Sequence, residues 1–90
     1  MKTSPAKIAA NVALVVKTRR SQLKLSQEDL ADKASIDRTY ASQIERAIAN
    51  PSLTVLCNLA NALNISLAQL LGESALAKEA LVVTTKRATP

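Results

Sequence analysis

The sequence has few of the side chains on which catalysis and metal binding usually depend. Its 90 residues include no histidine, one cysteine, one glycine and one aromatic residue, Tyr40. A lone cysteine cannot form an internal disulfide, and without histidine neither a Cys-His nucleophile nor a zinc site can be assembled. Because a glycine-rich phosphate loop is also missing, the residues provide no recognisable catalytic set. The sequence therefore predicts no enzyme activity, no cofactor and no metal.

Charge and aromatic content narrow the choice of partner. Twelve lysine and arginine residues against seven acidic ones give a net charge of +5 and a pI near 9.8. This balance favours an anionic partner such as nucleic acid, although many soluble domains carry a similar charge without one. Base stacking on single strands needs aromatic platforms, which the chain lacks apart from Tyr40. Double-stranded DNA is therefore the favoured polyanion.

The amino-terminal segment does not read as a membrane or export signal. Its apolar run is interrupted by Asn11 and ends in the basic residues Lys17, Arg19 and Arg20. The run is neither a convincing signal sequence nor long enough to cross a bilayer. We expect a cytoplasmic protein without a membrane partner.

Apolar content and periodicity predict an all-α fold. Almost half of the residues are apolar, with only one glycine and three prolines, so helix formers dominate over turn residues. Capping residues and helical spacing predict five helices, at about residues 5–23, 27–34, 38–46, 53–63 and 66–72. We divide the chain into a compact domain at 1–72 and a short carboxyl-terminal extension at 73–90.

Two short helices joined by a tight turn form the centre of this plan. Ser26 followed by Asp29 is a helix-start signature, because the hydroxyl can accept from a first-turn N–H and the carboxylate favours the positive end of the helix dipole. Asp37 offers a second N-cap just after Ser35. Alanines on the apolar faces let the two helices approach closely. This arrangement is the helix-turn-helix plan.

The outer face of the second helix of this pair carries side chains that can contact DNA. They recur at helical spacing and can hydrogen-bond to base edges or phosphates. The residues are Arg38, Thr39, Ser42, Gln43 and Arg46. A polar helix face is more often merely solvated, but its place after the turn favours DNA contact. The domain at 1–72 is therefore a candidate helix-turn-helix DNA-binding domain.

Two apolar surfaces are predicted in the carboxyl-terminal half. The fourth helix has one broad apolar face, formed by Leu53, Leu56, Cys57, Leu59, Ala60 and Leu63. Cys57 is therefore expected to be a small buried hydrophobe. The fifth helix is apolar on more than one side, through Leu67, Leu70 and Leu71. This surplus indicates a dimer interface, and a lid that closes over the monomer core is the alternative.

The extension at 73–90 has several interpretations. SALAKEAL could add a short helix, LVVTT has the β-branched residues of a strand, and KRATP is a basic end. Because an all-helical chain offers no partner strand, this segment could pair with its copy in a dimer or be disordered.

The order of the motifs resembles a known family. Residues 25–71 read LSQEDLADKASIDRTYASQIERAIANPSLTVLCNLANALNISLAQLL. With the preceding helix, they resemble the DNA-binding domain of the Cro and phage-repressor family, also called the xenobiotic-response-element (XRE) family. DRTY-x-S-x-IER followed by NPSL looks most like the controller proteins of restriction-modification systems. The resemblance implies a compact five-helix bundle of the lambda-repressor-like type.

The resemblance also implies roles for individual residues. Major-groove base reading is implied for Arg38, Thr39 and Gln43. Contacts to the DNA backbone or the groove edge are implied for Gln27, Tyr40, Ser42, Arg46 and Asn50. Arg20 and Glu45 match a pair that is usually a structural salt bridge between the first and third helices.

Two positions depart from the family pattern. The family often has glycine where this chain has Ser35 in the turn and Ala47 after IER. Such positions can require a positive φ, which glycine adopts without strain. Serine and alanine there would cost about 1 kcal/mol each if the backbone is unchanged.

These features predict a sequence-specific transcriptional regulator. It would bind a palindromic operator in double-stranded DNA as a homodimer, as a restriction-modification controller would. RNA polymerase is a candidate further partner through the acidic residues Glu28, Asp29 and Asp32, although first-turn acids are more often only solvated. The alternative is an antitoxin-type protein, in which residues 73–90 bind a toxin while the helix-turn-helix binds its own promoter.

Overall fold

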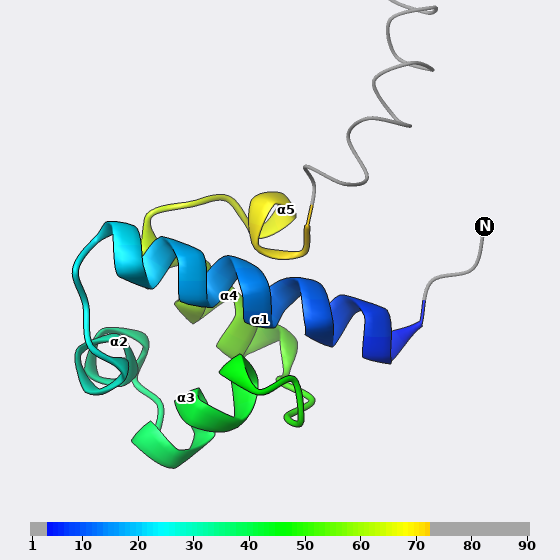
Figure 1. Cartoon of the computed structure of the whole chain (residues 1–90), viewed down its shortest axis with the longest axis horizontal. Coiled ribbons are helices and arrows are strands. Elements are labelled where there is room, and N and C mark those ends of the chain that lie inside the picture. The colour runs from blue at the N-terminus through cyan, green and yellow to red at the C-terminus, as the bar shows by residue number, and fades with distance from the viewer. Residues whose placement is uncertain (1–3, 73–90) are drawn as a thin grey trace, which may run out of the picture.

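The computed structural model describes residues 4–72, which form an all-α bundle (Figure 1). Its helices are α1 at Pro5–Gln22, α2 at Gln27–Ala34, α3 at Arg38–Glu45, α4 at Leu53–Leu63 and α5 at Leu67–Leu70. Within residues 4–72 there is no strand. The predicted fold class and the five predicted helices are confirmed. The helix and strand considered for 73–90 lie outside the described residues.

Each helix begins at a capping residue, and the predicted caps Ser26 and Asp37 are confirmed. Four serine hydroxyls accept from the backbone N–H three residues further on, at 3.0–3.2 Å; they belong to Ser4, Ser26, Ser52 and Ser66. Asp37 caps α3 by accepting from the Thr39 N–H at 2.8 Å. In α2, the Asp29 carboxylate accepts in turn from the Ser26 N–H at 3.0 Å. Hydrogen bonding of the carboxylate to the Ser26 N–H, and secondly to the Ser26 side chain, stabilises the charged form and lowers the pKa of Asp29.

The long helix α1 packs against three of the other helices. It contacts α3, α4 and α5, while α2 packs against α3 and α4. Figure 1 shows α1 across the middle, with α5 on one side and α2 and α3 on the other. Within residues 4–72, the cluster of buried core residues is aliphatic, and it includes Val16, Leu30, Ile44, Leu59, Leu63 and Leu70. Full burial of one such side chain stabilises the fold by about 1.5–3 kcal/mol.

The apolar face of α4 is narrower than the sequence pattern predicts. Leu59 and Leu63 are fully buried, whereas Leu53 is 68% exposed and Cys57 is exposed. The prediction that Cys57 is a buried hydrophobe is therefore wrong. Leu53 and Cys57 lie four residues apart along one edge of the face, away from its centre at Leu59 and Leu63. Apolar spacing alone does not show where a neighbouring helix stops covering such a face.

Helix α5 closes the monomer core. Leu70 is 0% exposed and belongs to the core cluster, so it cannot meet a second subunit. The prediction that Leu70 forms part of a dimer interface is therefore wrong, and for this residue the lid alternative holds. Leu67 and Leu71 are only partly buried against the same cluster. Their place in a dimer interface stays a prediction.

Several chain turns use the left-handed backbone conformation without glycine. Ser35 has a φ of 57° and Ala47 a φ of 60°, so both positions where the family often has glycine require a positive φ here. Lys24 and Asn64 share this conformation, with φ of 58° and 57°. Asn64 is the predicted end of α4, and asparagine tolerates the strain better than alanine does.

We expect Ala47→Gly to raise the free energy of unfolding by about 0.5–1 kcal/mol. Relief of left-handed strain contributes about 1–2 kcal/mol, and the greater freedom of glycine in the unfolded chain removes about 0.4–1 kcal/mol. Urea denaturation of the two proteins measures the difference. Ala10→Gly is the control, because Ala10 is exposed within α1. This substitution should lower the free energy of unfolding by about 1 kcal/mol. Equal losses at both positions would contradict the strain at Ala47.

Candidate nucleic-acid interface

The turn between α2 and α3 determines how the two helices are oriented relative to each other. Ser35 ends α2 in the left-handed conformation, and the Ile36 N–H donates to the Ala31 carbonyl at 2.9 Å. Asp37 then caps α3 at once, so only three residues separate the helices. Leu30, Ala34 and Ile44 are buried between the helices and the rest of the bundle. The result is a rigid helix-turn-helix with the amino-terminal end of α3 exposed to solvent.

A partly buried ion pair joins this unit to α1. Arg20 Nε and Nη2 donate to the two carboxylate oxygens of Glu45 at 2.7 and 2.9 Å, and Nη1 donates to the Leu25 carbonyl at 2.9 Å. The Glu45 side chain is 3% exposed and that of Arg20 is 22% exposed. The hydrogen bonds to Glu45 raise the pKa of the Arg20 guanidinium. The structure thus contains the salt bridge that the resemblance implies for Arg20 and Glu45.

Gln27 joins the same network, a contact that the sequence does not predict. Its Nε2 donates to Oε1 of Glu45 at 3.2 Å, which ties the first turn of α2 to the last turn of α3. The contact with the DNA backbone implied for Gln27 requires an accessible side chain. In the structure Gln27 is half-buried and lines a surface depression. A polar residue at a helix start carries no signal for a specific side-chain partner on a different helix.

Four of the predicted contact residues lie together. A shallow depression on the outer surface of α2 and α3 is lined by Gln27, Arg38, Thr39 and Ser42. A second depression adjoins it and is lined by Arg20, Ser26, Gln27, Glu28 and Arg38. Arg38 and Gln27 belong to both, so the two depressions form one surface at the amino-terminal ends of the helices. We call this the α2–α3 surface.

Glu28 also lies on this surface, although its sequence position predicts no role in DNA binding. Its Oε2 lies 3.9 Å from Nη1 of Arg38, and the two side chains are 69% and 70% exposed. The acidic face of α2 was a sequence signal for Glu28, but its closeness to Arg38 depends on the angle between two helices. Arg38 therefore combines high exposure with an acidic neighbour.

The remaining predicted DNA-contact residues line neither depression of the α2–α3 surface. Gln43 is half-buried, and the half-buried Tyr40 packs against the core. Arg46 is exposed and ends α3 as its C-cap. Asn50 is also exposed, in the loop between α3 and α4. The structure thus brings Arg38, Thr39 and the smaller polar residues together and leaves Asn50 apart from them.

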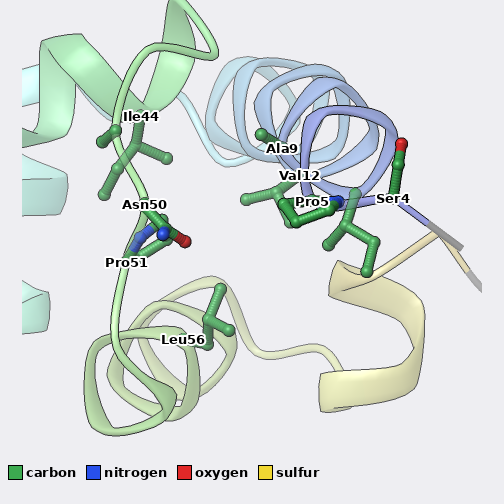
Figure 2. Close-up of a pocket in the computed structure, with 10 residues that line it drawn as sticks. Ser4, Pro5, Ala9, Val12, Ile44, Asn50, Pro51 and Leu56 are labelled. Carbon is green, nitrogen blue, oxygen red and sulfur yellow. The ribbon is translucent and has the colours of Figure 1, made fainter.

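Asn50 borders an apolar pocket of about 280 Å³ (Figure 2). Figure 2 shows Asn50 and Pro51 of the α3–α4 loop facing Pro5 and Val12 of α1, with Leu56 of α4 below them. Asn50 and Ser4 are the polar side chains in an otherwise aliphatic lining. The loop on which Asn50 lies therefore faces α1 and α4 across an apolar pocket, while Ala49 of the same loop packs against the core.

Within the described residues, features that are typical of membrane proteins and metalloproteins are missing. No helix within residues 4–72 is long and apolar enough to cross a membrane. In the same part of the chain, no three histidine, cysteine or acidic side chains gather as metal ligands would.

A helical bundle that exposes a polar, arginine-bearing α3 after a capped tight turn defines a helix-turn-helix domain of the DNA-binding class. Comparison with known families agrees with this class. The HTH_3 family model, described as helix-turn-helix, matches residues 16–70. The chain therefore belongs to the HTH_3 (XRE) family of DNA-binding transcription regulators, whose members are not enzymes.

Two curated proteins are among the similar sequences. The immunity repressor protein of Bacillus phage phi105 is 44% identical over 64 residues, which cover 71% of this chain and 44% of the repressor. The chain thus spans less than half the length of that relative. The control protein C.SmaI of Serratia marcescens is 41% identical over 64 residues, covering 71% of this chain and 76% of the control protein. The chain is thus related to restriction-modification controller proteins.

A solved structure has the same fold. It is the restriction-modification controller protein C.Esp1396I, determined as a tetramer in complex with its natural 35-base-pair operator. It is 33% identical to this chain, with a TM-score of 0.67, and the match covers 77% of this chain and 95% of the controller chain. The bundle described here is therefore shared with an operator-binding controller.

Proposed function

We propose that this protein is a homodimeric regulator that binds a roughly palindromic operator, as the controller of a restriction-modification operon. The observation that carries this proposal is the α2–α3 surface, where Arg38 and Thr39 lie together at the exposed start of α3. One α3 from each protomer would enter successive major grooves, about 34–36 Å apart. The related C.Esp1396I occupies its operator as an oligomer, which supports this arrangement.

The side chains of α3 suit direct reading of bases. Arg38 can donate two hydrogen bonds to O6 and N7 of guanine, and Thr39 can place its methyl group against the methyl of thymine. Gln43 can pair with adenine, although its partial burial limits its reach. Each good base contact should discriminate by about 1–3 kcal/mol.

Other residues would set the affinity for DNA and the position of the protein on it, rather than the preference for a base sequence. Arg46 is an exposed cation at the end of α3, and Asn50 lies in the loop that follows it. These two residues would contact phosphates or the groove edge, as would Gln27, Tyr40 and Ser42. Such contacts would fix the position of α3 in the groove. Leu67 and Leu71 supply the dimer contacts in this proposal. A contact of the acidic residues of α2 with RNA polymerase stays a prediction.

Salt dependence and stoichiometry test the proposal together. Affinity for a duplex should fall with salt, by about 0.9 in log K per unit of log salt concentration for each phosphate neutralised. Because a dimer carries two copies of Arg46, Arg46→Ala should reduce this slope by about 1.8 rather than 0.9. Lys33→Ala is the control, since Lys33 is an exposed cation that lines neither depression.

The measurement is fluorescence anisotropy of a labelled duplex at several salt concentrations, with the mass of the complex determined in parallel. Affinity independent of salt would contradict phosphate contact. One protomer per duplex would contradict the dimer. The antitoxin alternative depends on residues 73–90, which lie outside the described residues, and no described contact favours it.

A further inference from the structure

Glu28 lies beside the arginine that is proposed to read the operator. We infer that Glu28 is a positioning residue, which holds the Arg38 guanidinium ready for guanine and so sets base preference. This inference rests on the proposed function. The carboxylate and the guanidinium lie 3.9 Å apart, at the adjoining starts of α2 and α3. Both side chains line the same depression, so they would face DNA together.

The backbone at Glu28 is fixed on both sides. Before it, Gln27 donates to Glu45 at 3.2 Å, and Glu45 is itself held by Arg20. After it, Asp29 completes the reciprocal capping bonds with Ser26, at 3.0 Å each. The Glu28 carboxylate therefore projects from an anchored helix turn. A carboxylate on such a turn can restrict a flexible arginine, whereas one on a mobile loop could not.

The chemistry of the guanidinium allows the two contacts at once. Arginine has five N–H donors in a planar fork, and O6 and N7 of guanine use two of them. A carboxylate beside Nη1 leaves the donors on Nη2 free to meet a base. Because the pair is solvent-exposed, it should alter an equilibrium by no more than about fivefold. This strength is enough to favour one arginine conformation and too small to keep Arg38 from its base.

The negative charge also affects complexes with the wrong base. Where guanine is absent, Arg38 could turn towards a phosphate and gain affinity without any sequence information. Glu28 competes for the guanidinium and repels phosphates, so it lowers the affinity of such complexes. In Glu28→Gln we therefore expect tighter binding to a mismatched duplex. The preference for guanine over adenine at the base pair read by Arg38 should fall about threefold.

A double-mutant cycle tests this inference on the full-length protein. Wild type, Glu28→Gln, Arg38→Ala and the double variant are each titrated, at one salt concentration, with two duplexes. One duplex carries the operator selected by the wild type, and the other has adenine at the guanine whose preference Arg38→Ala abolishes. We expect Glu28→Gln to reduce the guanine preference only when Arg38 is present.

Asp32→Asn is the matched control. It removes one negative charge from α2, one helical turn beyond Glu28, and Asp32 is exposed and lines neither depression. It should leave the guanine preference unchanged. A change equal to that of Glu28→Gln would show a general charge effect and overturn the positioning role.

The outcomes separate this inference from the function on which it rests. If Arg38→Ala alters no base preference, the proposed reading by Arg38 fails. If Arg38→Ala abolishes the preference while Glu28→Gln leaves it intact, only the role of Glu28 is overturned. An effect of Glu28→Gln that persists without Arg38 would also overturn it, because Glu28 would then act on DNA directly, for example by accepting from cytosine N4.

Discussion

Arg38→Ala should abolish the preference for guanine at one position in each half of the operator. Loss of a bidentate contact to O6 and N7 removes about 1–3 kcal/mol of discrimination, which corresponds to about 5- to 150-fold in relative affinity. Because the Arg38 side chain is 70% exposed and packs against nothing in the core, its removal should leave the thermal stability nearly unchanged. The effect would therefore be one of recognition and not of folding.

Competition between operator variants measures this effect. Each base pair of the selected operator is replaced in turn, and the affinities of wild type and Arg38→Ala are compared at one salt concentration. Lys33→Ala, which removes an exposed cation outside both depressions, should weaken binding little and retain every base preference. A uniform loss of affinity in Arg38→Ala, with all preferences retained, would assign Arg38 to a phosphate instead.

Arg20→Met should cost about 3 kcal/mol in the free energy of unfolding. It leaves the Glu45 carboxylate, whose side chain is 3% exposed, without its cationic partner. Breaking a buried ion pair in this way usually costs about 3–5 kcal/mol, and the partial exposure of Arg20 places the effect at the lower end. For a domain of this size, the melting temperature should fall by at least about 12 °C.

The two halves of this ion pair should not be equivalent. Glu45→Gln leaves the Arg20 guanidinium without an anionic partner. The Arg20 side chain is 22% exposed, however, and it still donates to the Leu25 carbonyl. Water can reach that guanidinium, so Glu45→Gln should cost less than Arg20→Met. Thermal denaturation monitored by circular dichroism measures both variants. A smaller loss for Arg20→Met than for Glu45→Gln would contradict the burial of the carboxylate.

Local signals predict the helices well because they act within a few residues. A serine or aspartate followed by a free N–H two or three residues on caps a helix in any surroundings, and all five helices here begin in that way. The family's glycines indicate that the positions of Ser35 and Ala47 can require a positive φ, and the structure has a positive φ at both. These features depend little on distant parts of the chain.

The errors concern contacts between distant segments. Cys57 and Leu70 have similar apolar surroundings in the sequence, yet Cys57 is exposed and Leu70 is fully buried. Which of them is covered depends on where α1 and α5 cross α4, and periodicity carries no information on that. The same reason applies to the contact of Gln27 with Glu45, which spans 18 residues. In the site, residue types were predictable, and the family resemblance implied the Arg20–Glu45 pair, but the contacts of Gln27 with Glu45 and of Glu28 with Arg38 were not predicted.

The most direct test of the central claim is selection of bound duplexes from a random DNA pool by the full-length protein. The account predicts a consensus with two-fold symmetry, whose half-sites lie about one helical turn, or 34–36 Å, apart. In the same selection, Arg38→Ala should lose guanine at one position in each half. Enrichment of no sequence, or of a single unpaired half-site, would contradict a homodimer that reads its operator through α3.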